Sequence, residues 1–285
     1  MNTQSYLVWR CMGNNDICSH LFGIISSYCL AENLNKRFMV KWFRSDKDED
    51  ILSINLRNKY TLNTSLPHLK EYLIPDYELA SLLEENDVVK LWMNKSICIK
   101  SCHNMYQHFC VNRPNYRYKS YLLDILTKLP KIINIKRTVY DLIPKNIGQV
   151  VGIHICRGKY TDEESVKDIL HKINIDLKTN PETKSNHVLV VSDYREDIKL
   201  AESILEKVTI IPCFHDNLKT LTITVNMISL SKCKSLYIKW FDDFSRLSAI
   251  LNPYRSFFTF EHPNYFMCRY KCPIDELLSY YNRMK

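Results

Sequence analysis

The chain contains 285 residues, a length that suits one large domain or two domains of ordinary size. Hydrophobic residues make up 46% and charged residues 25%, which is typical of a folded globular protein and excludes a disordered or collagen-like chain. The formal net charge of +8 favours anionic partners such as phosphorylated molecules, acidic membranes or nucleic acid. Because the basic residues are scattered and form no nucleic-acid-binding motif, we expect no nucleic-acid partner.

The sequence shows no signal for export or for insertion into a membrane. No apolar run approaches the roughly 18 residues of a spanning helix, and the first residues lack the basic patch and apolar core of a signal peptide. The 11 cysteines are odd in number and spread over the chain, as is typical of reduced thiols. We therefore expect a cytoplasmic protein without a membrane span.

The amino-terminal segment predicts a strand, a helix and a second strand. The strands are residues 6–10 and 37–42, the helix spans about 17–33, and a turn with Gly13 joins the first strand to the helix. A strand–helix–strand unit of this kind places its two strands in parallel.

After this unit the pattern is weaker. Residues 116–140 predict two helices that are separated at Pro130. Residues 144–148 have the composition of a turn, and we place a domain boundary there. The predicted domains are therefore 1–145 and 146–285.

The second half alternates short apolar strands with helices. The predicted strands are residues 149–156, 187–191, 209–212, 235–238 and 257–260. The predicted helices are residues 163–177, 195–205, 219–230 and 244–251, with a last helix at 273–281. Continuous apolar strands separated by helices indicate a parallel sheet that is covered on both faces.

These patterns together predict an α/β fold with two Rossmann-like domains that face each other across a cleft. In open parallel sheets, ligands bind beyond the carboxyl ends of the strands. We therefore expect a binding site in the cleft, built from the residues that follow the strands.

The residues at the end of strand 149–156 have the chemistry of a diphosphate site. Arg157 offers a planar fork to phosphate oxygens, and Gly158 lets backbone amides approach them. The alternative is a surface loop that contains an arginine by chance. Asp193, at the end of the next strand, suits a ribose or a guanine edge, and its alternative role is to cap the following helix.

Residues 154–160, HICRGKY, resemble the H-x-R-R-G-D-Y motif of α-1,2-fucosyltransferases and the related motif of α-1,6- and protein O-fucosyltransferases. Further along the chain, VLVVSD (188–193), NMISLSKC (226–233) and a turn at 242–245 follow in the order found in that superfamily. Residues 10–42 are similar to its opening turn, helix and strand, whereas 43–145 match nothing in it.

The resemblance implies an inverting, metal-independent fucosyltransferase that moves fucose from GDP-fucose to a glycan hydroxyl. The partners would be GDP-fucose or another nucleotide sugar and a glycan acceptor, with no cofactor besides the donor. The implied fold is GT-B-like. Its amino-terminal domain is expected on the acceptor side, and its carboxy-terminal domain is expected to bind the donor.

The resemblance also implies roles for the motif residues. Arg157 matches the arginine that contacts the donor diphosphate, and it is the expected catalytic residue because a guanidinium stabilises charge on the departing GDP. His154 and Asp193 are assigned to the nucleoside end. Ser245, with Phe244, matches a turn that closes on the phosphates.

Four further residues complete the expected donor site. Gly158 and Lys159 follow Arg157 in the same loop, beside the phosphates. Gly13 and Asn14 belong to the first turn of the amino-terminal domain and are expected to face the donor or the acceptor across the cleft.

The chain departs from the family at several positions. Cys156 replaces an arginine, Lys159 replaces an acidic residue, and Asp242 and Asp243 stand where small hydroxyl residues are usual. These carboxylates would repel a diphosphate unless they are turned away or act as a base. The alternatives to a fucosyltransferase are therefore a transferase that uses a different nucleotide sugar and a non-catalytic transferase-like binding protein. A basic nucleic-acid-binding protein is a further alternative, which a steep salt dependence of DNA or RNA affinity would support. Asp16, Asp242 and Asp243 are the candidates for a general base.

Two patterns offer metal sites, although we expect no bound metal. Cys98/Cys102 and Cys268/Cys272 have spacings from which a structural zinc site could be built, and buried thiols are the alternative. The run SDKDED (45–50) contains the Asp-x-Asp spacing of metal-dependent sugar transferases, but its composition is that of a solvated loop. A requirement for Mn²⁺ would favour that second class of enzyme.

Overall fold

A computed structural model of the chain divides into two compact units, residues 1–136 and 137–285. It describes residues 5–10, 17–41, 54–56, 58–60, 73–74, 96–100, 127–157, 162–205, 209–211, 219–239, 242–251, 256–259 and 268–271. The predicted boundary between residues 145 and 146 falls inside the second unit, shortly after helix α6 (Arg137–Asp141).

The first unit contains a parallel sheet with a helix packed on it. Strand β1 (Tyr6–Arg10), helix α1 (Ile17–Asn33) and strand β2 (Arg37–Lys41) confirm the predicted strand–helix–strand unit. Strands β5 (Ile97–Lys100) and β4 (Leu73–Ile74) extend the sheet in the order β2-β1-β5-β4, with every pair parallel.

Close packing between α1 and β1 explains one of the few glycines. Trp9 is completely buried in β1. A Cβ atom on Gly23 of α1 would lie 2.9 Å from the indole Nε1 of Trp9, which is closer than a methyl group tolerates. The glycine therefore lets the helix lie directly against the indole ring.

The prediction of a helix break at Pro130 is wrong. Helical backbone runs from residue 127 to 132, past the proline, and strand β6 (Ile133–Ile135) follows at once. Proline has a backbone φ that suits a helix and removes only one amide donor, so the chain stays helical for two more residues. The β-branched Ile133 and Ile135 then pair with β3 (Ile54–Leu56) in an antiparallel ladder.

The second unit confirms the predicted alternation of strands and helices. Its strands are β7 (Val151–Ile155), β8 (His187–Ser192), β9 (Thr209–Ile211), β10 (Ser235–Ile238), β11 (Ser256–Thr259) and β12 (Cys268–Lys271). Its main helices are α7 (Glu163–Thr179), α8 (Arg195–Ile204), α9 (Lys219–Lys232) and α10 (Asp243–Ile250). The helix predicted at 273–281 lies outside the described residues.

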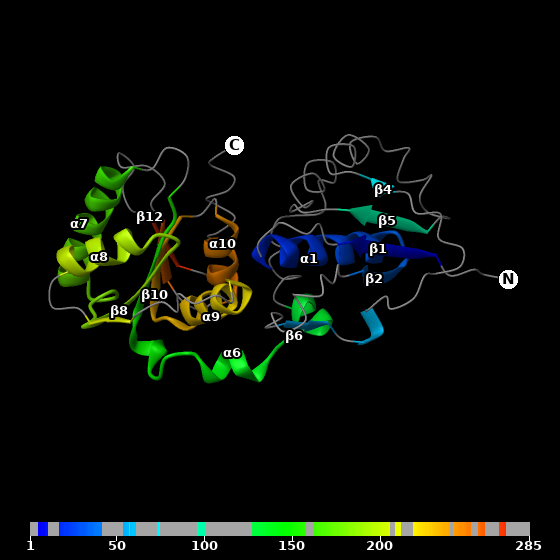
Figure 1. Cartoon of the computed structure of the whole chain (residues 1–285), viewed down its shortest axis with the longest axis horizontal. Helices are drawn as coiled ribbons and strands as arrows, with labels where there is room; N and C mark the ends of the chain where they lie inside the picture. Colours follow the sequence, from blue (N-terminus) through cyan, green and yellow to red (C-terminus); the bar gives the residue numbers. More distant parts are fainter. Residues whose placement is uncertain are drawn as a thin grey trace. The chain divides into compact units, whose positions relative to one another are not determined.

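The sheet of this unit has the order β12-β11-β10-β7-β8-β9 and is parallel except for β12. Figure 1 shows α7 and α8 on one face of it and α9 and α10 on the other. Every residue of β7 is buried, as a strand covered on both faces requires. The core on the α7–α8 face includes Val151, Ile153, Leu170, Val190 and Tyr237.

Gly152 marks the close approach of α9 to the opposite face of β7. A Cβ atom there would lie 2.7 Å from methyl carbons of Leu230 and Leu236 and 3.1 Å from the sulfur of Cys233. We expect Gly152→Ala to lower the free energy of unfolding by about 1–3 kcal/mol, because the added methyl overpacks a filled core. Denaturation in urea would measure the change, and an unaltered transition midpoint would contradict the packing described.

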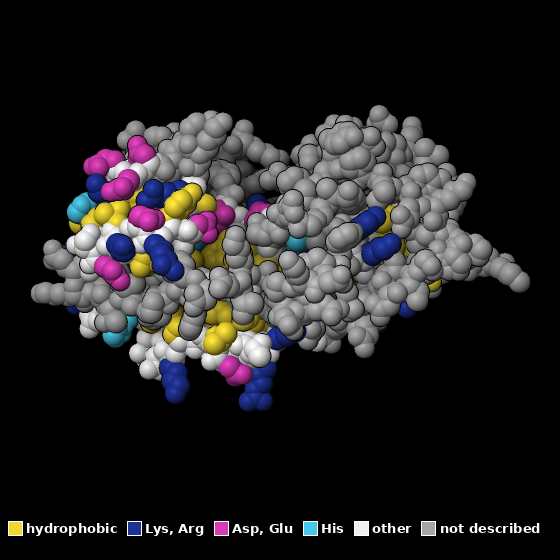
Figure 2. All heavy atoms as spheres, in the orientation of Figure 1, with side chains coloured by type: hydrophobic (Ala, Val, Ile, Leu, Met, Phe, Trp, Pro, Cys, Tyr) yellow, Lys and Arg dark blue, Asp and Glu magenta, His cyan; other side chains and the backbone are white. Residues whose placement is uncertain are grey.

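The surface of the second unit carries mixed charge. On the face that Figure 2 draws, Lys and Arg side chains lie among Asp and Glu side chains over α7 and α8. On α7 this mixing includes ion pairs of Lys167 with Glu163 and Glu164, at 3.5 and 3.4 Å. None of the helices in the described part of the chain is long and apolar enough to cross a membrane.

Candidate functional site

Polar and charged side chains gather at the carboxyl ends of three strands that are neighbours in the sheet, β10, β7 and β8. They are His154 on β7 with Cys156 and Arg157 directly after it, Ser192 at the end of β8 with Asp193 directly after it, and Lys239 and Asp242 after β10. Asp242, Lys239 and Asp193 are all close enough to influence the pKa of the Cys156 thiol, so the three strand ends form one cluster. This is the edge at which parallel sheets bind ligands.

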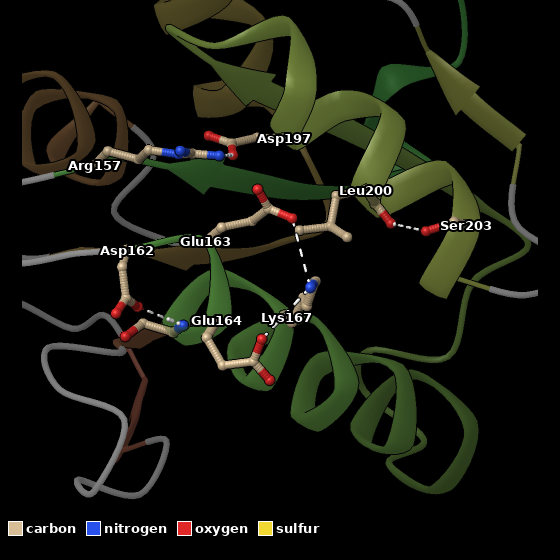
Figure 3. Close-up of polar contacts among 9 residues, drawn as sticks. Arg157, Asp162, Glu163, Glu164, Lys167, Asp197, Leu200 and Ser203 are labelled. Atoms are coloured by element: carbon tan, nitrogen blue, oxygen red, sulfur yellow. Dashed lines mark hydrogen bonds and ion pairs between the residues drawn. The ribbon is translucent and has the colours of Figure 1, made fainter.

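Arg157 is held by a buried carboxylate from helix α8. Its Nε donates to Oδ1 of Asp197 at 2.8 Å, and its Nη2 donates to the same oxygen (Figure 3). Asp197 is completely buried, whereas the Arg157 side chain keeps 20% of its surface exposed. The hydrogen bonds to Asp197 raise the pKa of Arg157 above its ordinary value, so the guanidinium is charged at any working pH.

Two further contacts fix the geometry of this pair. Ser192 donates a hydrogen bond of 2.7 Å from its hydroxyl to Oδ2 of Asp197. The Cζ atom of Arg157 lies 4.9 Å from the ring centroid of Tyr194, a cation–π distance. Among the described residues, Nη1 of Arg157 has no hydrogen-bond partner. The arrangement therefore presents a partly exposed, pre-oriented cation at the carboxyl ends of β7 and β8.

Sequence reasoning proposed Arg157 as a site residue but did not predict the residues that hold it. Asp197 lies in the first turn of α8, where an acidic residue is commonly explained by its favourable interaction with the helix dipole. That explanation gives no reason to expect a contact between Asp197 and Arg157. The signal that could reveal it is the position of Asp197, four residues after the strand-end Asp193. Asp193 itself is exposed, and the alternative that it caps α8 is wrong, because Tyr194 is the N-cap.

His154, Phe244 and Ser245, three of the predicted donor-site residues, lie close together. The Nδ1 atom of His154 and the hydroxyl oxygen of Ser245 are 2.5 Å apart, and the His154 and Phe244 rings lie 4.6 Å apart between centroids. Both His154 and Ser245 are buried. Burial lowers the pKa of His154, against smaller opposing effects of Asp242 and Asp193, so the imidazole is neutral at pH 7.

The two carboxylates that depart from the family have partners of their own. Asp242 is the N-cap of α10 and accepts a hydrogen bond of 2.7 Å from the amide of Ser245 through Oδ2, which is 3.5 Å from Nδ1 of His154. Asp243 accepts a hydrogen bond from Nη2 of Arg246. The negative charge of each is thus offset by a helix N-terminus or a guanidinium.

Cys156, which the motif resemblance aligns with an arginine, is a protonated thiol. Burial raises its pKa to about 12, and the neighbouring Asp242 contributes through its charge and a hydrogen bond. A neutral thiol in place of an arginine gives the cluster one positive charge fewer. Among the described residues, Lys239 is a cation that lies close enough to lower the pKa of the thiol.

Because a raised pKa favours the thiol and the thiolate is the nucleophile, Cys156 should resist alkylation in the folded protein. At pH 8 a thiol with this pKa is ionised in about one molecule in ten thousand, against about a quarter for an ordinary cysteine. Peptide-level mass spectrometry after iodoacetamide treatment would measure the rate. Asp242→Asn keeps a capping side chain but removes the charge, so Cys156 should react faster in that variant.

That prediction has an internal control. The same peptide should be alkylated rapidly once the protein is unfolded in guanidinium chloride. Equally rapid alkylation of Cys156 in the folded and unfolded protein would contradict the environment described for the thiol.

Several predicted site residues lie outside the described residues. They are Gly13, Asn14, Gly158 and Lys159, together with Asp16, the SDKDED run at 45–50, Cys102 and Cys272. Within the described ranges, no group of three or more His, Cys, Asp or Glu side chains is arranged to hold a metal ion.

Comparisons with known proteins give a result at the level of structure. No family model matches the sequence, and no curated protein matches it significantly. The solved structure of the fucosyltransferase NodZ from Bradyrhizobium aligns with 95% of this chain and 100% of its own, at 11% identity and a TM-score of 0.63. FUT1 of Arabidopsis thaliana in complex with GDP aligns with 90% of this chain and 70% of its own, at 12% identity and a TM-score of 0.65.

The chain shares the fold of these two solved fucosyltransferases. POFUT1 in complex with GDP-fucose shares it over 88% of this chain and 94% of its own, at 10% identity and a TM-score of 0.50. NodZ has also been solved as an α-1,6-fucosyltransferase soaked with GDP-fucose. The predicted likeness to fucosyltransferases is therefore confirmed for the fold alone. The motif itself and the arrangement of two domains across a cleft stay predictions.

Proposed function

We propose that the protein is a glycosyltransferase that uses a nucleotide sugar, with GDP-fucose as the donor and a glycan hydroxyl as the acceptor. One observation carries the proposal. Arg157 is a charged, partly exposed side chain fixed by Asp197 and Tyr194 at the carboxyl ends of β7 and β8. It occupies the donor-arginine position of a motif similar to that of fucosyltransferases, in a chain with their fold.

In the proposed reaction the acceptor oxygen bonds to the anomeric carbon from the side opposite GDP, which inverts that centre. The bond from this carbon to the phosphate oxygen breaks, and GDP leaves with the electron pair. Negative charge then develops on the diphosphate, where the fixed guanidinium of Arg157 stabilises it most strongly. A guanidinium in this role makes a divalent cation unnecessary, and the proposal is therefore a metal-independent enzyme.

The other described residues of the site have supporting roles in this proposal. His154 lies with Phe244 and Ser245 at the ends of β7 and β10, and we assign this group to the nucleoside and phosphate contacts. The acceptor must lose a proton. Asp16, Asp242 and Asp243 stay the candidate bases; of these, Asp242 caps α10 and Asp243 pairs with Arg246.

A second candidate function is a nucleotide-sugar-binding protein without transfer activity. It is favoured by Cys156, since the neutral thiol takes the place of a cation that the motif would supply. Lys159, in the same loop, is the proposed replacement for that charge. The two candidates differ in one measurable property, turnover of a bound donor.

Calorimetry on the purified protein tests the proposal directly. We expect GDP and GDP-fucose to bind equally well with and without EDTA, and UDP and UDP-sugars to bind more weakly. Release of GDP from GDP-fucose in the presence of an array of glycan acceptors would then distinguish the enzyme from the binding protein. A preference for UDP-sugars, or binding that requires Mn²⁺, would contradict the proposed donor and mechanism.

A further inference from the structure

A cavity of about 240 Å³ in the first unit has no role in the proposed transfer reaction. It lies between the last two turns of α1, the start of β2 and the 3₁₀ helix η1 (Asn58–Tyr60). The start of β2 is at the amino edge of the parallel sheet, whereas the turn predicted to face the donor follows the carboxyl end of β1. The cavity is therefore at the other end of the sheet from that turn.

Aromatic rings form one part of the lining. Tyr28, Phe38 and Tyr60 come from three different elements and pack edge to face, with centroids 5.5 Å apart for Tyr28–Phe38 and 5.9 Å apart for Tyr28–Tyr60. Phe38 and Tyr60 close the triangle at 6.2 Å. Rings held by one another in this way make a rigid apolar wall, which suits the C–H face of a sugar ring.

Positively charged side chains form the second part of the cavity lining. Lys36, Arg37 and Lys59 line the cavity. Lys36 is only 7% exposed and donates a hydrogen bond of 3.0 Å to the hydroxyl of Ser5, and its burial lowers its pKa. Because an ammonium group loses hydration when it is buried, a nearby anion stabilises it more than it would stabilise an exposed lysine.

Among the described residues of the lining, one carboxylate is the third part, and an ion pair neutralises it. Glu32 forms an ion pair of 2.5 Å with Lys128. The hydroxyl of Tyr28 hydrogen-bonds to the same glutamate, and burial together with this bond raises the pKa of Tyr28. The three cations of the lining therefore outweigh its negative charge, while Glu32 and the tyrosines still supply hydrogen-bonding groups for hydroxyls.

We propose that this cavity binds a monosaccharide unit that carries a negative charge, as a carboxylate, a phosphate or a sulfate. An apolar aromatic wall, an excess of cations and hydrogen-bonding groups for hydroxyls together match this class of ligand better than an uncharged sugar or a bare anion. The volume is below the roughly 300–1,000 Å³ of pockets for drug-sized ligands, which agrees with a single sugar unit. The inference does not depend on the transferase activity proposed above.

Binding to the full-length protein can be measured by calorimetry with glucuronic acid, glucose 6-phosphate, glucose 6-sulfate, glucose and inorganic phosphate. At least one charged sugar is expected to bind tenfold or more tightly than both glucose and inorganic phosphate. Arg37→Gln and Lys59→Gln change exposed side chains and should weaken that binding at least fivefold. Tyr60→Leu tests the aromatic wall and should weaken binding of the charged sugar by a similar factor.

The control is Arg137→Gln, which removes an exposed arginine in the second unit and should leave this binding unchanged. Arg157→Lys, which should fold normally, should slow the proposed transfer but leave this binding unchanged, so that loss of transfer activity and loss of sugar binding are separate results. Failure of every charged sugar to bind, or equal affinity for glucose and a charged sugar, would overturn the inference. Inorganic phosphate that binds as tightly as glucose 6-phosphate would overturn it too, since the site would then recognise only an ion.

Discussion

Replacing Arg157 with alanine is expected to lower the rate of sugar transfer by roughly 10²- to 10³-fold. The guanidinium is the described side chain best placed to stabilise charge on a leaving diphosphate, and it is already oriented by Asp197. The same change should weaken binding of GDP by about 1.5–3 kcal/mol, the usual contribution of a hydrogen bond to a charged group. Steady-state kinetics and calorimetry with GDP would measure the two effects.

Stability has to be separated from catalysis in this variant. Removing Arg157 leaves a completely buried carboxylate without its cation, and the loss can reach about 3–5 kcal/mol. Arg157→Lys keeps the charge but loses the planar fork, so it should fold normally and still transfer sugar slowly. Arg137→Ala is the matched control, because that arginine is 93% exposed. Full activity in a folded Arg157→Ala protein would refute the assignment of this site.

Asp197→Ala should affect both stability and transfer, although Asp197 is buried and acts through Arg157. The alanine removes the acceptor for two guanidinium hydrogen bonds and for the hydroxyl of Ser192. We expect the free energy of unfolding to fall by about 1.5–3 kcal/mol, less than for Arg157→Ala, because the guanidinium that remains is partly exposed to water. Transfer should fall by about 10²-fold, because displacement of a catalytic group by about 1 Å has an effect of that size.

A double-mutant cycle distinguishes a positioning role from a purely structural one. In the Arg157→Ala background, Asp197→Ala should cause no further loss of transfer, since there is no guanidinium left to orient. The destabilisation should also be less than additive, by about 0.5–3 kcal/mol, as is usual for residues in direct contact. Independent, additive losses of activity would show that Asp197 does not act through Arg157.

The sequence predicted the sheet of the second unit well because its strands are continuous apolar runs. Strands of this kind, separated by helices, have few alternatives to a parallel sheet covered on both faces. The order of motifs then placed His154 and Ser245 in one site, and the structure brings them within 2.5 Å. Hydrophobic pattern and chain order therefore sufficed to bring these two residues together, and their role in a donor site stays a prediction.

What the sequence did not predict depends on contacts between elements. The role of Asp197 requires the register of α8 against β7, which no local pattern encodes. Strand β6 has three residues and exists because it pairs with β3, which is far away in the chain. The cavity in the first unit needs Tyr60 of η1 to lie beside Tyr28 of α1, and sequence spacing does not indicate that contact.

The parallel pairing of β1 with β5 has a consequence for synthesis of the chain. Leu7 pairs with Ile97, so β1 has only β2 beside it until some 90 further residues have been made. At translation rates of about 5–20 residues per second this takes roughly 5–20 seconds. During that time the strand that holds Leu7, Val8 and Trp9, all buried in the finished protein, lacks its second neighbour. The nascent first unit should therefore be a good substrate for chaperones that bind apolar segments at the ribosome.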